Sequence, residues 1–213
     1  MRNIPLLTFA FIAIISKNSF GQSITTGVKL GLNSAFIGGE YANNIDFQHI
    51  STFNAGAYAK FDIFGLLALQ PELLYTMKGY KEIRTSFPTF ATNFNPTWNT
   101  SYLEIPILLK LNIPSSSFGI IKPNIFTGPE VAFKLSAKVK DQLPGQLPQE
   151  HDVPNTNSTD FGIIFGAGID INLTITTIML DIRYDLGIRN VCGSQNSSNI
   201  LNRVISLNAG IGI

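Results

Sequence analysis

Apolar and polar residues alternate with a period of two in eight separate segments of this sequence. From Ile178 to Arg189, the even positions hold isoleucine, leucine and tyrosine, whereas the odd positions include two aspartates, two arginines and a glycine. The last segment, from Ile205 to Ile213, repeats this pattern with serine, asparagine and glycine on the polar side. Such alternation is typical of a β-strand with one apolar and one polar face, whereas a helix would space its apolar residues by three and four. We therefore predict an all-β fold.

The connections between these segments are long and short in turn. Long connections occupy residues 35–50, 81–97, 139–158 and 190–200, and short ones lie at Gly65, at 114–118 and at Thr174. A barrel in an outer membrane has long loops at one rim and tight turns at the other. We therefore expect residues 22–213 to form an eight-stranded antiparallel up-and-down transmembrane β-barrel, with four long outer loops and three short periplasmic turns.

A soluble eight-stranded barrel would show the same alternation with its two faces exchanged. Several segments, however, exceed the roughly ten residues that a tilted strand needs to cross a bilayer. The polar face is also rich in glycine, which weakens a strand on a water-exposed face but suits the crowded interior of a small barrel. We therefore predict that the polar face points into the lumen, together with the large side chains on that face, which are Tyr58, Leu74, Leu108, Phe126 and Ile164.

The first 21 residues have the features of a secretory signal peptide. Arg2 supplies the positive charge, Ile4 to Ile15 forms the apolar core, and Ser19-Phe20-Gly21 places small residues at the −3 and −1 positions before Gln22. We therefore expect secretion across the inner membrane and insertion into the outer membrane of a Gram-negative cell. The single cysteine, Cys192, lies in a Gly-, Ser- and Asn-rich connection and can form no intramolecular disulfide. Aromatic residues near strand ends, where a membrane interface is expected, are Tyr75, Trp98, Tyr102 and Tyr184.

With the polar face inward, the lumen would hold nearly equal numbers of positive and negative side chains. The basic residues are Lys29, Lys60, Lys78, Lys110, Lys122, Lys134, Arg183 and Arg189. The acidic residues are Asp62, Glu72, Glu104, Glu130, Asp170, Asp181 and Asp185. Because buried unpaired charges are strongly unfavourable, this near balance predicts ion pairs. An eight-stranded barrel is just wide enough for its side chains to fill it, which argues against a general diffusion porin.

We expect part of this set to form a lumen charge network, consisting of Lys60, Glu72, Glu104, Lys110, Glu130, Asp181, Arg183 and Asp185. Glu72 and Glu104 lie on neighbouring predicted strands at similar depth. Their expected partners are Lys60, Lys110 and Arg183. The same charges could instead line a narrow polar path or a proton-linked site, but no cluster stands out in sign or spacing. We favour a lumen closed by salt bridges.

Two motifs carry a resemblance to a known family. They are LQPELLY at residues 69–75, followed by Lys78-Gly79, and YLEIPILLK at residues 102–110. Both are similar to the central signature of the PorT-like outer-membrane β-barrel proteins. This resemblance implies an eight-stranded outer-membrane barrel and, for the name-giving branch, a part in protein secretion and maturation at the cell surface. One departure is the end of the chain at Ile211-Gly212-Ile213, where many barrels have an aromatic residue that the assembly machinery recognises.

The sequence offers no strong catalytic or ligand-binding motif. Its two histidines, His49 and His151, stand beside acidic residues in predicted outer loops, without an arrangement of nucleophile, base and orienting group. Their spacing matches no zinc site, and no phosphate-binding loop, dinucleotide fingerprint or paired-cysteine motif is present. Charged residues make up 14% of the chain and its net charge is +1, without the basic patch typical of a nucleic-acid-binding protein. We therefore predict no enzymatic activity, no cofactor, no metal and no nucleic-acid partner.

The lumen and the long loops remain as places for a specific function. The connection 139–158 is rich in proline, glutamine and asparagine, and loops on a rigid scaffold commonly carry recognition. We predict a noncatalytic, monomeric outer-membrane barrel that acts as a scaffold or surface-binding component. Its expected partners are outer-membrane lipid, the barrel-assembly machinery and, through the resemblance, proteins of a secretion apparatus. The alternative is a narrow solute or ion pathway.

Overall fold

The computed structural model of the protein describes residues 24–38, 45–84, 96–114, 119–141, 149–153, 156–191 and 200–213. The expected signal peptide at residues 1–21 and Cys192 lie outside the described residues and stay predictions. Within the described ranges, no helix is long and apolar enough to cross a membrane.

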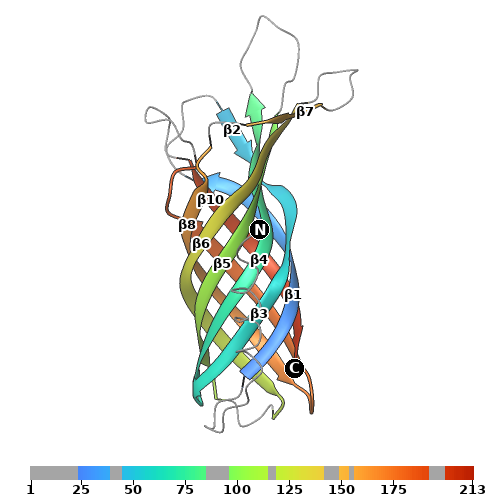
Figure 1. Ribbon diagram of the computed structural model, residues 1–213, viewed down its shortest axis with the longest axis vertical. Coiled ribbons are helices and arrows are strands. Elements are labelled where there is room, and N and C mark those ends of the chain that lie inside the picture. Colours follow the sequence, from blue (N-terminus) through green and yellow to red (C-terminus); the bar gives the residue numbers. More distant parts are fainter. Residues whose placement is uncertain are drawn as a thin grey trace, which may run out of the picture.

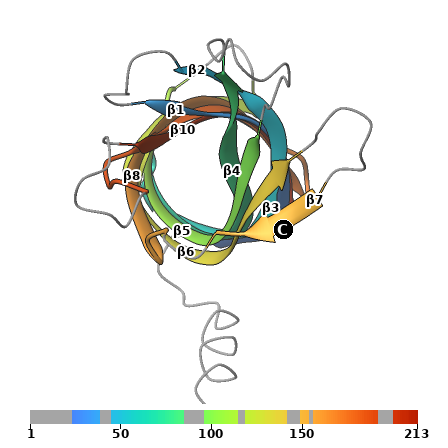
Figure 2. The same ribbon diagram turned by 90° about the horizontal axis from the view of Figure 1, so that it is seen from above.

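Ten strands make up the described part of the chain. They are β1 (Ile24–Gly38), β2 (Ile45–Gln48), β3 (Ile50–Phe64), β4 (Leu67–Arg84), β5 (Thr97–Asn112), β6 (Ile121–Asp141), β7 (Gln149–Asp152), β8 (Thr159–Asn172), β9 (Thr177–Gly187) and β10 (Leu201–Gly212). Eight of them pair antiparallel in the order β4-β3-β1-β10-β9-β8-β6-β5, and the pairing of β4 with β5 closes the ring (Figures 1 and 2). The predicted eight-stranded antiparallel barrel is confirmed.

The two ends of the barrel differ, as the connection lengths predicted. At one end, here the short-turn end, lie the described turn residues 65–66, 119–120 and 173–176, together with the C-terminus (Figure 1). At the opposite end, here the long-loop end, the consecutive strands of the ring are separated in sequence by residues 39–49, 85–96, 142–158 and 188–200. The strands β2 and β7 lie at this long-loop end, beyond the ring of eight strands.

The predicted bounds of the long connections 35–50, 81–97 and 139–158 are wrong. Strands β1, β4 and β6 continue to Gly38, Arg84 and Asp141, and the short strands β2 and β7 pair with the far ends of β4 and β6. The clear alternation of apolar and polar residues is missing from two of these segments: Ala35, Phe36 and Ile37 follow one another in β1, and β7 has no apolar residue. In β2 it covers only four residues. Backbone hydrogen bonding continues there because it does not require lipid on one side.

A β-bulge in β6 reverses its faces near the long-loop end. Ser101 pairs with Ser136, but the next residue, Tyr102, pairs with Lys134, so β6 holds one extra residue at this point. A bulge shifts the alternation by one position. Consequently Ala137 is buried, whereas Lys138 is exposed.

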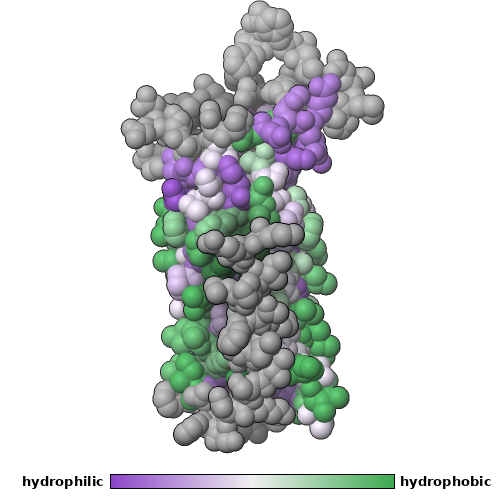
Figure 3. Space-filling model, in the orientation of Figure 1, coloured by the Kyte–Doolittle hydropathy of each residue, from purple (hydrophilic) through white to green (hydrophobic). Residues whose placement is uncertain are grey.

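Apolar side chains cover the outside of the barrel. They include Leu32 on β1 and its pairing partner Leu207 on β10, which are 73% and 62% exposed. Figure 3 shows hydrophobic residues over most of the visible height of the barrel and hydrophilic residues at the long-loop end. Such a surface suits a hydrocarbon solvent. Tyr102 does not belong to it: the expectation of an interfacial side chain is wrong, because this residue is 1% exposed and points into the lumen.

We expect Leu207→Arg to destabilise the barrel by about 2–4 kcal/mol, because a charge near the bilayer midplane must leave water without a partner. Leu207 lies in the middle of β10 and faces outward. Equilibrium urea unfolding of protein refolded into vesicles measures the effect. Ile213→Arg is the control, since Ile213 is exposed at the short-turn end and a charge near the interface costs only about 0–1 kcal/mol. Equal losses would contradict this placement of the membrane.

Large and small side chains share the inside of the barrel, as the sequence predicted. Leu108, Phe126 and Ile164 form a buried apolar cluster between three strands. A Cβ atom at Gly166 would collide with the ring of Phe126, so glycine at this position makes room for the aromatic side chain. Tyr58 and Leu74 are buried as well.

Candidate functional site: the charged lumen

The eight residues of the predicted lumen charge network are all buried inside the barrel, each no more than 7% exposed. Four other charges that were expected in the lumen are not fully enclosed: Lys122 is exposed, and Asp62, Lys134 and Arg189 are half-buried. Two buried acids, Glu82 and Asp160, were missing from the expected set. The other buried charges form three clusters along the barrel axis.

The central cluster consists of Lys29, Glu72, Asp181 and Arg183. Lys29 Nζ lies 2.9 Å from Glu72 Oε1 and 3.0 Å from Asp181 Oδ2. The Arg183 guanidinium contacts the same two carboxylates at 3.0 and 3.1 Å. Gln70 donates a further hydrogen bond of 2.7 Å to Glu72. Two cations thus balance two anions, which is the arrangement in which a buried ion pair can offset its desolvation cost.

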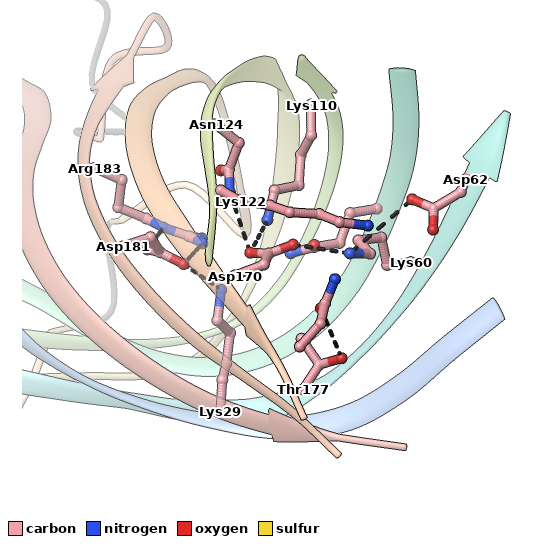
Figure 4. Close-up of polar contacts among 12 residues, drawn as sticks. Lys29, Lys60, Asp62, Lys110, Lys122, Asn124, Asp170, Thr177, Asp181 and Arg183 are labelled. Carbon is pink, nitrogen blue, oxygen red and sulfur yellow. Dashed lines mark hydrogen bonds and ion pairs between the residues drawn. The ribbon is translucent and has the colours of Figure 1, made fainter. Parts of the chain in front are cut away.

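The short-turn cluster gathers around Asp170, two residues before the end of β8. Lys60 and Lys110 lie 2.8 and 3.1 Å from its two carboxylate oxygens, and Asn124 donates to Asp170 at 3.1 Å. Figure 4 shows these side chains converging from different strands across the lumen. The second contact of Lys60, with the half-buried Asp62, is 4.0 Å long. Two lysines therefore face one fully buried acid, Asp170, and one half-buried acid, Asp62.

The long-loop cluster consists of Lys78, Glu104, Glu130 and Asp185. Lys78 Nζ lies 3.1 Å from Glu104 Oε2 and 2.9 Å from Glu130 Oε1, and it also donates a hydrogen bond to Asp185 Oδ2. Oxygens of the three carboxylates lie within 4.8 Å of one another, close enough to hold a metal ion. However, the Lys78 ammonium already contacts all three. One cation faces three anions, so this end of the lumen has a surplus of negative charge.

The expected partners of Glu72 and Glu104 are only partly correct. Arg183 does bind Glu72, but Lys60 and Lys110 bind Asp170 instead. Glu104 lies in a different cluster from Glu72 and contacts Lys78. The predicted network therefore omitted three residues at the centres of the clusters, namely Lys29, Lys78 and Asp170. The alternating pattern of their strands had already placed all three on the lumen face, so the sequence did contain a signal for them.

These contacts cross the lumen. Charged side chains from strands on opposite walls meet at three depths, and apolar side chains such as Leu108 and Phe126 lie between them. Arg183 also lies over an aromatic ring, since its Cζ is 5.4 Å from the centre of the Phe126 ring. The described lumen is thus a packed core, and its excess of negative charge lies in the long-loop cluster.

A second candidate surface lies beyond the barrel. Strands β2 and β7 extend the far ends of β4, β5 and β6 into a five-stranded patch, here the outer sheet. Tyr80 stacks on Trp98 with ring centres 5.9 Å apart, and Phe47 packs edge-on against Tyr80 at 5.4 Å. All four residues of β7 are exposed. The outer sheet thus combines an aromatic row with an exposed edge strand.

Charged residues on the outer sheet pair across β6 and β7. Lys140 and Lys138 contact Glu150 at 2.8 and 3.3 Å, and these contacts hold the pKa of Glu150 below its usual range. His151 on β7 and His49 between β2 and β3 are exposed. Among the described residues, the one grouping that could hold a metal contains neither histidine.

Comparison with known proteins gives a consistent result. The structure of OprG from Pseudomonas aeruginosa superimposes with a TM-score of 0.53 at 10% identity, covering 90% of this chain and 94% of that one. A major outer membrane protein from Thermus thermophilus gives 0.51 at 12% identity, covering 90% and 100%. Neisserial surface protein A (NspA) is 16% identical over 91% of this chain and 99% of that one, with a TM-score of 0.47. No curated protein matches the sequence.

The likeness to the two structures with the higher scores shows the fold alone, because their identities are low. A family model carries the assignment further. It is described as the outer membrane protein beta-barrel domain and matches residues 20–193, most of the chain. The protein therefore belongs to this family of β-barrels, and its place is the outer membrane.

Proposed function

We propose that this protein is a noncatalytic scaffold or surface-binding component of the outer membrane, and that it acts through the outer sheet. The observation that carries the proposal is the contrast between the buried lumen and the exposed outer sheet. The charged side chains of the lumen are buried and contact one another across it, whereas β7 is exposed along its whole length at the long-loop end. Recognition is thus possible at the outer sheet without any change in the barrel.

A role in protein secretion or surface display is the more specific form of this proposal. It rests on the resemblance of residues 69–75 and 102–110 to the PorT-like proteins. The charged residues of these motifs, Glu72, Glu104 and Lys110, all lie in the lumen. The motifs therefore describe how the barrel is packed, and the secretion role needs independent support from an identified partner.

Photo-cross-linking on intact cells tests the surface role. A photoreactive residue replaces Gln149, which is exposed on β7, and the control places it at Ile175, which is 82% exposed at the short-turn end. We expect a discrete adduct from position 149 that mass spectrometry identifies as a cell-surface or secretion protein. Adducts from position 175 alone, or from neither position, would contradict a partner at the outer sheet.

The alternative function, a narrow solute or ion pathway, would require the lumen to open. Polar side chains do occupy the lumen at every depth, but contacts of 2.8–3.1 Å join them across it. Conductance of the refolded protein in a planar bilayer separates the two functions. Reproducible single-channel steps would favour the pathway over the closed scaffold.

A further inference from the structure

In the long-loop cluster, three carboxylates share a single cation. The side chains of Lys78, Glu104, Glu130 and Asp185 are between 0% and 6% exposed. Among the described residues, Lys78 is the one cation in contact with these three carboxylates. Unpaired negative charge at such burial is strongly unfavourable, so the cluster requires a further positive charge.

The hydrogen bonds of the cluster show where that charge is needed. An ammonium group has three donors, and Lys78 directs its contacts at one oxygen of each carboxylate. Three oxygens of the cluster, Glu104 Oε2, Glu130 Oε2 and Asp185 Oδ1, are buried with no hydrogen-bond donor among the described residues. Glu104 Oε2 still lies 3.1 Å from the Lys78 ammonium, whereas the other two have no cation beside them in the described part of the chain. Glu130 and Asp185 lie on β6 and β9, the two strands that flank β8, and oxygens of their carboxylates lie within 4.8 Å of each other.

The backbone of β8 provides the space in which these two carboxyl groups meet. A Cβ atom at Gly162 would lie 2.6 Å from Glu130 Oε1 and 3.0 Å from Asp185 Oδ1. Both groups are therefore packed against the Gly162 backbone, where a side chain on this residue would collide with Glu130. If both carboxyl groups were ionised here, their like charges would repel each other and neither could donate a hydrogen bond to the other.

We propose that Glu130 and Asp185 share one proton in the folded barrel, which makes the long-loop cluster a proton-binding site of the lumen. The proton comes from solvent during folding. The bound proton neutralises one negative charge, and the resulting carboxyl O–H of one residue donates to a carboxylate oxygen of the other. This hydrogen bond gives Glu130 Oε2 and Asp185 Oδ1 a partner, and Glu104 Oε2 keeps its contact with Lys78. This inference goes beyond the proposed surface role and does not depend on it.

The neighbouring groups are consistent with a single proton between these two residues. Asp160 on β8 has its own donors, since it accepts hydrogen bonds of 2.7 Å from Asn202 and 2.9 Å from the Phe161 N–H. Glu104 on β5 keeps its contact with Lys78 on β4. Tyr102, also on β5, lies beside Asn202, and Arg183, the nearest cation along β9, is bound to Glu72 and Asp181 in the central cluster.

Infrared spectroscopy of the refolded protein tests the proposal directly. In chelator-treated buffer at neutral pH, we expect a carboxylic-acid C=O band that shifts in D2O. Glu130→Gln and Asp185→Asn should each abolish this band, because each removes one member of the pair. Glu72→Gln is the matched control and should keep it, since Glu72 is balanced by Lys29 and Arg183. Absence of the band, or its survival in both Glu130→Gln and Asp185→Asn, would overturn the proposal.

The pH dependence of folding gives a second, independent readout. Above about pH 5 the carboxyl groups of the unfolded chain have lost their protons, so folding takes up one proton. The folding constant of the wild-type barrel should therefore fall about tenfold per pH unit until the pair deprotonates. Glu130→Gln, which is neutral at every pH, should lose this component. If wild type and Glu130→Gln have the same slope, or if sodium or calcium ions stabilise a wild-type barrel that lacks the band, the site does not hold a proton.

Discussion

Arg183→Leu should destabilise the folded barrel by about 3–5 kcal/mol, because it leaves Glu72 and Asp181 buried with one cation in place of two. The Arg183 side chain is 4% exposed and contacts both carboxylates within 3.1 Å. Lys29 alone would then face two anions. The free energy of unfolding in urea, measured in lipid vesicles, gives the loss.

A matched control and a double-mutant cycle separate charge pairing from packing. Lys138→Ala breaks an ion pair whose side chains are 48% and 41% exposed, and exposed pairs contribute little, so no measurable change is expected. Combining Arg183→Leu with Glu72→Gln should cost less than the sum of the two single changes, because the second removes a charge that the first left unpaired. Strict additivity would mean that Arg183 stabilises the barrel through its hydrocarbon chain and not through its charge.

The alternation of residues predicted the fold and the face of nearly every strand position. Lys60, Glu72 and Arg183 lie in the lumen because each occupies a position on the polar face of its alternating strand. The error over Tyr102 came from its position near a strand end, although its phase had already placed it on the lumen face. Phase in a strand is therefore more informative than distance from the strand end.

The pairing within the lumen could not be read from the sequence. Lys60 on β3 meets Asp170 on β8, 110 residues away and on a strand that is not its neighbour. Which residues meet across a barrel depends on the tilt and stagger of its strands, and neither follows from alternation. The bulge in β6 is a second case, since a single extra residue between Lys134 and Ser136 exchanges the faces beyond it.

Phe126→Ala should cost about 3–5 kcal/mol, because it leaves a cavity in a lumen that is otherwise filled. The ring contacts Leu108 and Ile164 and lies under the charges of Arg183 and Lys110, at 5.4 and 5.8 Å. No lipid can enter this enclosed space to replace it. Urea unfolding in vesicles measures the loss, and heat-modifiable migration on a gel shows whether the variant still forms a barrel.

Phe133→Ala provides the comparison, since Phe133 lies on the same strand but is 43% exposed on the outer face. Lipid can occupy the space that it vacates, so a clearly smaller loss is expected. Gly166 supplies a further test, because a Cβ there collides with the Phe126 ring. Gly166→Ala should destabilise the wild-type barrel by about 1–3 kcal/mol through overpacking and should cost less once Phe126 is alanine. A smaller cost remains in that background, because the new Cβ would still lie 2.7 Å from the Ile182 carbonyl oxygen. If Gly166→Ala has the same cost in both backgrounds, the ring of Phe126 is not the group that requires glycine at this position.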